Sequence, residues 1–474
     1  MTDDLVAALQ RLDDAEYPGG RARLDPALVV RAGRHRKRAR RIAGASAACV
    51  VVVAAALGGA ALGDPGNPHQ PIGPITTTTS APTATASGSP TPTPSPTLYP
   101  GTVTTLPSGS LPNPTTSGVF GVPVALDPVG GAPAIIVGAG DGSVLPVVVT
   151  PMPPDSGAEV VPAYRSGLGL WTPGGTIGWV VAPPKTPTRG PQIVEATVDA
   201  NWIVWFESDF ATAWDTPYVL RAQARHGGVA REIARSEKPP GGLPEQAIDD
   251  HHPVIVGDTL FWYDEVYQGG GPSFVVRSVP LDGSRPATVA VRGVMTMFGD
   301  RCAAPGRPAL FVATGTDVTG HQELHRLTVD PSGSVATDQT VRGDLLGAAE
   351  DVSGVGACGD TVAVAHDVDE ASANRGSWLE VDHGGEVRTF VWPFGLGSSI
   401  VDVTVGPDLV TWAMSSGTME GARYVLGLGN GTLDELPQEP GFAHITSDGS
   451  FAWWTTAGDV PKSGHPVAAR IAAG

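Results

Sequence analysis

The C-terminal three quarters of the chain repeat one local pattern, a tight turn followed directly by an apolar or aromatic strand. The pattern recurs at intervals of 42 to 57 residues, and its strands are marked by Ile203, Leu260, Leu310, Val362, Leu409 and Phe451. A second marker, a glycine turn later in each unit, keeps the same phase at Gly227, Gly283, Gly333, Gly384 and Gly431. Two turn signals that stay in phase constrain this part of the chain to fold as repeated units.

Each unit reads as four short strands joined by a tight turn, a longer loop and a glycine turn. In the second complete unit we predict strands at 252–256, 259–264, 274–280 and 288–292. Four antiparallel strands in about 40–50 residues are typical of a β-propeller blade. The series resembles TolB-like and WD-like propellers, although the Trp-Asp signature is absent. The resemblance implies an all-β propeller and carries over no catalytic residues.

The number of blades depends on how the ring closes. The last unit, from Phe442 onward, has room for about three strands, so it needs a strand from elsewhere in the chain. Residues 118–196 contain four strand-like segments, enough for about one blade and the borrowed strand. We therefore favour seven blades over six and assign 118–474 to the propeller.

An uncharged stretch at 42–63 predicts a single transmembrane helix. At about 1.5 Å per residue it would span roughly 33 Å, enough to cross a bilayer core. Seven basic residues lie between Arg31 and Arg41, and none follows until Arg165. The positive-inside rule then places the N-terminus in the cytosol and the propeller outside the cell. The alternative is a signal peptide cleaved after Gly63, but the apolar run is longer than a usual signal peptide requires.

The segments on either side of the apolar stretch differ in character. Residues 1–41 read as two short helices, and the tail resembles actinobacterial membrane proteins encoded near extracytoplasmic-function sigma factors. That resemblance implies a regulatory partner in the cytosol, although the zinc-binding His-x₃-Cys-x₂-Cys motif is absent. Residues 64–117 are dominated by Pro, Thr, Ser and Gly, so we predict a disordered linker.

Charge is divided unevenly along the chain. The formal net charge is −18 in total and +4 over residues 1–41, which leaves −22 for the remainder. Nucleic-acid binding by the exported part is therefore excluded, because phosphate backbones attract Lys and Arg. The basic tail fits a membrane surface with anionic lipids.

Three cysteines give one predicted disulfide. Cys49 lies within the apolar stretch, whereas Cys302 and Cys358 fall at the end of the first strand in neighbouring repeats. Equivalent positions on neighbouring inner strands lie close together in a propeller, and an exported domain is in an oxidising compartment. We therefore predict a bond between Cys302 and Cys358.

Few residue patterns suggest chemistry. The segment His321 to His325 has two histidines but not the His-Glu-x-x-His order of a zinc peptidase, and it enters a predicted strand. The glycine-rich stretch 138–142 is read as a hairpin turn. Two polar clusters could offer ligands to Ca²⁺, although we interpret them as solvated loop charges: Asp249, Asp250, His251 and His252, and Asp367, Asp369 and Glu370.

The sequence therefore predicts a membrane-anchored, extracytoplasmic propeller that binds a protein or small ligand, without a predicted cofactor. The alternative is a wall-associated hydrolase or lyase that uses acidic residues of the propeller channel, since fold alone does not exclude catalysis.

Overall fold

The computed structural model describes residues 100–472 with gaps at 107–110, 152–163, 209–216, 237–250, 269–270, 301, 303–308, 316–321, 331–332, 344, 346–349, 369–376, 393–398, 416–421, 437–444 and 457–464. The predicted cytosolic tail, the apolar stretch 42–63 and most of the predicted linker lie outside these ranges. In the described part every regular element is a strand, which confirms the all-β prediction there. None of the described residues belongs to a helix long and apolar enough to span a bilayer.

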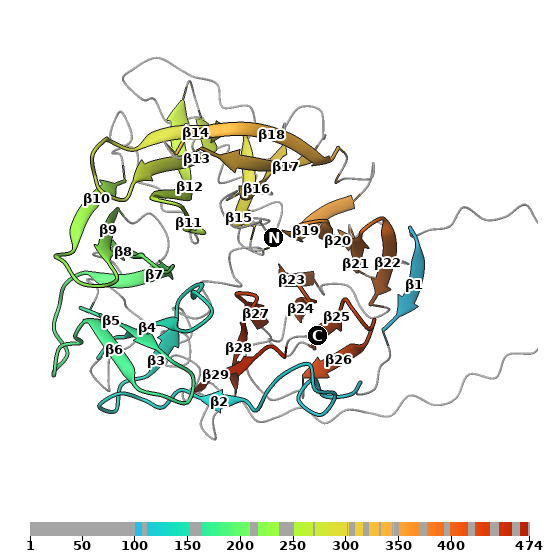
Figure 1. Cartoon of the computed structure of the whole chain (residues 1–474), viewed down its shortest axis with the longest axis horizontal. Coiled ribbons are helices and arrows are strands. Elements are labelled where there is room, and N and C mark those ends of the chain that lie inside the picture. Colours follow the sequence, from blue (N-terminus) through green and yellow to red (C-terminus); the bar gives the residue numbers. More distant parts are fainter. Residues whose placement is uncertain are drawn as a thin grey trace, which may run out of the picture. The chain divides into compact units, whose positions relative to one another are not determined.

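Seven sheets form the blades of a propeller (Figure 1). Blade 1 contains β3 (Ala134–Ile136), β4 (Leu145–Val149), β5 (Gly167–Trp171) and β6 (Ile177–Val181). Blade 2 contains β7 (Gln192–Val198), β8 (Trp202–Ser208), β9 (Tyr218–Ala224) and β10 (Arg231–Arg235). Blade 3 contains β11 (Val254–Val256), β12 (Thr259–Gln268), β13 (Gly271–Pro280) and β14 (Thr288–Arg292). Blade 4 contains β15 (Val294–Gly299), β16 (Ala309–Gly315), β17 (Gln322–Val329) and β18 (Val335–Arg342).

The remaining blades follow the same antiparallel order. Blade 5 contains β19 (Glu350–Cys358), β20 (Thr361–Val368), β21 (Trp378–His383) and β22 (Glu386–Val391). Blade 6 contains β23 (Ser399–Val405), β24 (Leu409–Ser415), β25 (Arg423–Gly427) and β26 (Leu433–Leu436). Blade 7 contains β27 (Ile445–Ser447), β28 (Phe451–Thr456), β29 (His465–Arg470) and β2 (Val124–Ala125). The favoured count of seven blades is confirmed.

The ring closes with a borrowed strand. The C-terminal part of the chain supplies the three inner strands of blade 7, and β2 supplies the outermost one. Val124 pairs with Ala468 and Ala125 with Val467, in antiparallel register. The closing strand therefore comes from the part of the chain that the sequence predicts, and residues from Ala134 to Val181 form the additional blade.

A segment before the closing strand crosses the outer edges of two further blades, and we call residues 100–106 and 111–120 the strap. Its strand β1 (Thr102–Thr105) extends blade 5 by pairing in parallel with β22. Beyond it, the backbone N–H of Glu435 in blade 6 donates to Pro112 O at 2.9 Å, and the Ser117 hydroxyl donates to Asp434 Oδ2 at 2.6 Å.

The strap corrects the predicted boundary at residue 118, because described residues before it, in β1 and at Pro112 and Ser117, already contact the blades. The cause is local composition. All four residues of β1 are exposed, so the strand is held by edge hydrogen bonds and shows no apolar alternation. Leu106 is its anchor: it is 1% exposed and packs in the cluster that contains Phe390 and Trp412.

The core consists of seven apolar layers, each between two neighbouring blades. This follows from the period of two along each strand, which sends alternate side chains to opposite faces of a blade. Trp205, Trp262 and Trp412 occupy the second strands of blades 2, 3 and 6 and are fully buried. Packing between neighbouring blades accounts for the positions of all three.

Candidate functional site

The connections between strands give the propeller two different faces. The connections from the first to the second strand and from the third to the fourth strand of each blade share one face. We call it the tight-turn face, because in blade 5 both connections are short turns, at Cys358–Thr361 and His383–Glu386. The other face carries the second-to-third and fourth-to-first connections, and we call it the long-connection face. In blade 2 these run from Ser208 to Tyr218 and from Arg235 to Val254.

Not every connection follows this division between short and long connections. In blade 3 the hairpin between Gln268 and Gly271 is short although it lies on the long-connection face. In blade 4 the first-to-second connection is long, from Gly299 to Ala309, and it contains Cys302. In blades 2, 3, 5, 6 and 7 the first-to-second connections are short, whereas in blade 1 this connection runs from Ile136 to Leu145.

One aspartate occupies the first-to-second connection of every blade: Asp141, Asp199, Asp258, Asp300, Asp360, Asp408 and Asp448. Aspartate suits such turns because its carboxylate can accept hydrogen bonds from backbone N–H groups two or three residues later. Asp199 Oδ1 accepts from the N–H groups of Asn201 at 2.8 Å and Trp202 at 2.7 Å. These residues form a layer that we call the aspartate layer.

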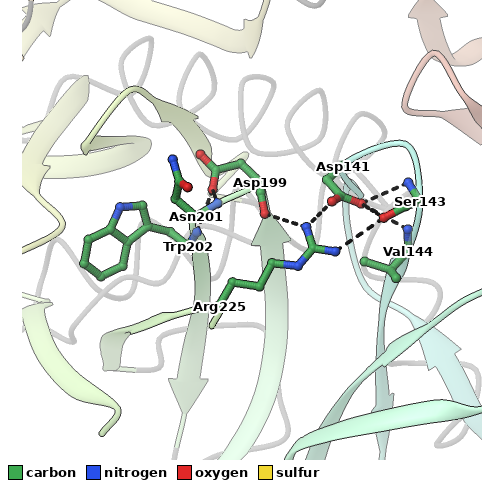
Figure 2. A network of polar contacts seen from close by, with 7 residues as sticks. All are labelled: Asp141, Ser143, Val144, Asp199, Asn201, Trp202 and Arg225. Atoms are coloured by element: carbon green, nitrogen blue, oxygen red, sulfur yellow. Dashed lines mark hydrogen bonds and ion pairs between the residues drawn. The ribbon is translucent and has the colours of Figure 1, made fainter. Parts of the chain in front are cut away.

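Figure 2 shows how the aspartate layer joins blades 1 and 2. Asp141 Oδ1 accepts from the N–H groups of Ser143 and Val144, both at 3.0 Å, while Oδ2 forms an ion pair with Arg225. Arg225 also donates to Asp199 O at 2.9 Å and to the Ser143 hydroxyl at 3.3 Å. The guanidinium therefore links two turns that belong to different blades.

Electrostatics distinguish the two aspartates of this network. Burial raises the pKa of Asp141, but hydrogen bonds from Arg225, Ser143 and Val144 outweigh burial and leave the pKa below its usual value. Burial also raises the pKa of Asp199, and there it prevails over the hydrogen bonds from Asn201 and Trp202. Asp141 is accordingly the anion that Arg225 neutralises.

The aspartate layer forms links at two further junctions. The Trp202 indole donates from Nε1 to Asp258 Oδ1 at 3.0 Å, which connects blades 2 and 3. Between blades 4 and 5, Asp300 Oδ1 accepts from the N–H of Cys302 at 3.0 Å and of Gly359 at 3.1 Å.

A disulfide joins Cys302 and Cys358 at that same junction, with the Cα atoms 5.1 Å apart. This is the pairing that the sequence predicts. Asp300 lies close enough to both sulfurs for the three residues to resemble a metal-ligand group. Because the sulfurs are bonded to each other, they are not thiolates, and the group has the chemistry of a structural cross-link.

His251, one of the predicted candidates, lies in a buried polar network between blades 2 and 3. Its backbone N–H donates to Glu195 Oε2 at 2.9 Å. Its ring stacks on Phe206, with centroids 4.2 Å apart, and meets the edge of Tyr218 at 4.7 Å. These contacts hold His251 as a packing residue of the junction.

The network continues into blade 3 through Tyr218. The Tyr218 hydroxyl donates to Asp264 Oδ2 and accepts from Trp262 Nε1, each at 2.9 Å. Asp264 forms an ion pair with Arg277 at 2.6 Å. Burial, followed by the charge of Asp264, raises the pKa of Tyr218 well above its usual value. A buried, paired set of this kind specifies how two blades meet.

The other predicted candidates are not gathered into a site by the described residues. His252 is half-buried with a φ of 44°. Asp367 lies in β20. Asp249, Asp250, Asp369 and Glu370 fall outside the described ranges, so both Ca²⁺ sets remain predictions. His325 lies on a strand, as predicted, with Nδ1 2.8 Å from Asp338 Oδ1.

Sequence reasoning missed a second buried charged cluster, between blades 4 and 5. Arg342 NH1 lies 2.5 Å from Glu380 Oε1, and His366 Nε2 lies 4.0 Å from Glu380 Oε2. The His366 ring stacks on Trp378 with centroids 4.7 Å apart. Burial, together with the charge of Arg342, lowers the pKa of His366 to about 4. The sequence signal that could have revealed this cluster was a charged residue in an apolar strand, at a position where the alternation of side chains points into the core.

Comparison with known proteins assigns the chain to no family. No protein-family model matches the chain, and no curated protein matches it. Among solved structures, the chain is similar to a puromycin hydrolase at 16% identity and a TM-score of 0.43, over 70% of this chain and 53% of that one. The chain thus spans about half the length of that hydrolase.

Two other solved structures align with about two thirds of the chain. The propeller domain of the Trilobed protease from Pyrococcus furiosus aligns at 8% identity and a TM-score of 0.40, over 68% of this chain and 92% of that one. TolB from Acinetobacter baumannii aligns at 10% identity and a TM-score of 0.32, over 66% and 78%. The described part of the chain is a seven-bladed β-propeller by its own sheet topology.

Proposed function

We propose that the chain is a membrane-anchored binding module whose propeller presents its long-connection face to a protein or small ligand outside the cytoplasm. Residues 42–63 would serve as the anchor, and the basic residues before them would stay in the cytosol. In the same proposal, residues 1–41 are available to a cytosolic regulatory partner.

The observation that carries the proposal is the point at which the strap reaches the propeller. Strand β1 runs parallel to β22, with Thr102 opposite Arg388 and Thr105 opposite Val391. Because β22 begins at the turn after His383, its first residues lie on the tight-turn face. The chain that arrives from the predicted linker therefore reaches the propeller at the tight-turn face.

This point of entry lies on the opposite side of the propeller from the long-connection face. Longer connections on a rigid scaffold are where binding residues concentrate in proteins generally. The tight-turn face, by contrast, is engaged in links between blades, as the ion pair of Asp141 with Arg225 illustrates. The long-connection face is thus the better placed of the two to receive a partner.

No described residue set favours the hydrolase or lyase alternative. Two of the buried carboxylates are held by arginines: Asp264 pairs with Arg277 and Glu380 with Arg342. The Thr361 hydroxyl lies 2.7 Å from His383 Nδ1, but Thr361 is buried and out of reach of a substrate. The binding module therefore stands as the proposal.

Protease treatment of intact cells tests the anchored topology. With an epitope at each end of the full chain, added protease should remove the C-terminal epitope and leave the N-terminal one on a small membrane fragment. Permeabilised cells, in which both epitopes are digested, serve as the control. A mature protein that begins near Asp64 and is found free in the medium would contradict the proposal.

A further inference from the structure

The aspartate layer leaves one buried carboxylate oxygen without a counter-charge. In blade 1 Asp141 Oδ2 is paired with Arg225, and in blade 4 Asp300 Oδ2 lies 2.5 Å from Arg326. Asp448 of blade 7 is 8% exposed, and its Oδ1 accepts from the N–H groups of Ser450 at 2.8 Å and Phe451 at 2.7 Å. Its Oδ2 is shielded from solvent and has no hydrogen-bond partner among the described residues.

Asp448 Oδ2 points to the glycine-rich turn of blade 1, across the junction where the ring closes. A methyl group added at Gly140 would lie 2.8 Å from Asp448 Oδ2 and 2.0 Å from Val144 O. A methyl group at Gly142 would lie 2.8 Å from Ser450 Oγ. Asp448 Oδ2 and Val144 O therefore both lie next to Gly140, and Ser450 Oγ lies next to Gly142 in the same turn.

An unpaired carboxylate in such a place is unfavourable, because burial of an ion without a counter-charge opposes folding. The equivalent oxygens in blades 1 and 4 avoid that cost through arginine. Beside Asp448 Oδ2, the turn of blade 1 offers the carbonyl oxygen of Val144, and the hydroxyl of Ser450 lies next to the same turn. Carboxylate, carbonyl and hydroxyl oxygens are the ligands of hard cations, and irregular sets of them suit Ca²⁺ better than the strictly octahedral Mg²⁺.

We propose that Ca²⁺ binds at the junction of blades 7 and 1 through Asp448 Oδ2, Ser450 Oγ and Val144 O. The ion would lock the ring at its closure, where blade 7 is completed only by the two-residue strand β2. It would act there as the Cys302–Cys358 disulfide acts at the junction of blades 4 and 5. This site is separate from the two polar clusters for which the sequence suggests Ca²⁺.

The test is thermal unfolding of the full chain in detergent micelles, after EDTA treatment and during titration with CaCl₂. A ligand that binds only the folded state raises the unfolding temperature in proportion to the logarithm of its concentration. We expect that rise in the wild type and a much smaller one with MgCl₂. Asp448→Asn keeps the oxygen that closes the turn and removes the charge, so it should weaken the response to Ca²⁺ at least tenfold.

The matched control is Asp282→Asn. Asp282 also lies in a turn of the tight-turn face, where its Oδ1 accepts from the Ser284 N–H at 2.9 Å, but it is exposed. This variant should respond to Ca²⁺ as the wild type does. The proposal is overturned if Ca²⁺ leaves the wild-type unfolding temperature unchanged. It is equally overturned if Asp448→Asn responds with wild-type affinity, since the ion would then bind elsewhere.

Discussion

Replacing Cys302 and Cys358 together with alanine should lower the stability of the propeller by a predictable amount. The bond closes a loop with a sequence separation of 56 residues, for which the chain-entropy relation gives about 14 cal/mol/K, or about 4 kcal/mol at 25 °C. The backbone hydrogen bonds that Asp300 accepts from the two neighbouring turns do not involve the sulfurs. They should survive, so the cross-link itself accounts for the expected loss.

That loss converts to a measurable shift in unfolding temperature. Unfolding entropies of about 2.1 cal/mol/K per residue, applied to the span 100–472, give about 0.8 kcal/mol/K and hence a decrease of about 5 °C. Scanning calorimetry should give the same decrease for the double alanine variant and for the reduced wild type. Cys49→Ala is the matched control and should leave the unfolding temperature unchanged.

Counting the free thiols of the chain tests whether the disulfide is present. The denatured, non-reduced full chain has three cysteines and should titrate as one free thiol, that of Cys49. Three free thiols per chain, or a double alanine variant as stable as the wild type, would show that the reasoning is wrong.

Three further substitutions probe the strap, the inner turns and the buried histidine. Leu106→Ala should cost about 2–4 kcal/mol in urea unfolding because Leu106 is buried in the core between blades 5 and 6, whereas Val103→Ala, at an exposed position of β1, should be neutral. Equal effects would mean that Leu106 does not anchor the strap. Gly138→Ala should lower soluble yield, because its methyl group would lie 1.9 Å from Ala196 O; a normal yield would contradict this close approach. Burial lowers the pKa of His366 from 6.5 to about 4, so as pH falls the unfolded chain takes up the proton before the folded chain does. The free energy of unfolding should therefore decline between pH 6.5 and pH 4, by up to about 3 kcal/mol. His366→Gln should reduce this dependence between pH 7 and 4.5, and an unchanged urea profile would indicate that other groups cause it.

Local signals were sufficient to predict the blades. In blade 3 the predicted segments 259–264 and 274–280 fall within β12 and β13, and 288–292 coincides with β14. The structure extends β12 to Gln268 because the hairpin pairs Gln268 with Gly271 through main-chain hydrogen bonds. Main-chain pairing does not require apolar side chains, so hydrophobic pattern underestimates such strands.

The strap shows what local signals miss. Thr102–Thr105 has the composition of the linker before it, and its partner β22 lies more than 280 residues away in sequence. Leu106 was the one strong apolar signal in this segment, and a single leucine does not identify its partner. Long-range edge pairing is decided by the closed ring, which exists only after the blades have assembled.

The buried polar networks also contain some features that the sequence can predict and others that it cannot. That two side chains of one strand share a face could be inferred, because Trp262 and Asp264 are two residues apart on β12. Pairs between blades, such as His251 with Glu195, depend on how two sheets face each other. Their geometry is not encoded in any local period, so His251 could be singled out but not assigned a partner.

Site-specific photo-crosslinking in intact cells tests the central claim most directly. Met295 is 37% exposed at the start of β15, on the long-connection face, and Val229 is 90% exposed in the β9–β10 turn, on the tight-turn face. A photo-reactive phenylalanine analogue placed at either position samples one face. The account predicts a discrete extracytoplasmic crosslink from position 295 and none from position 229. A crosslink from position 229 alone, or none from either position, would contradict it.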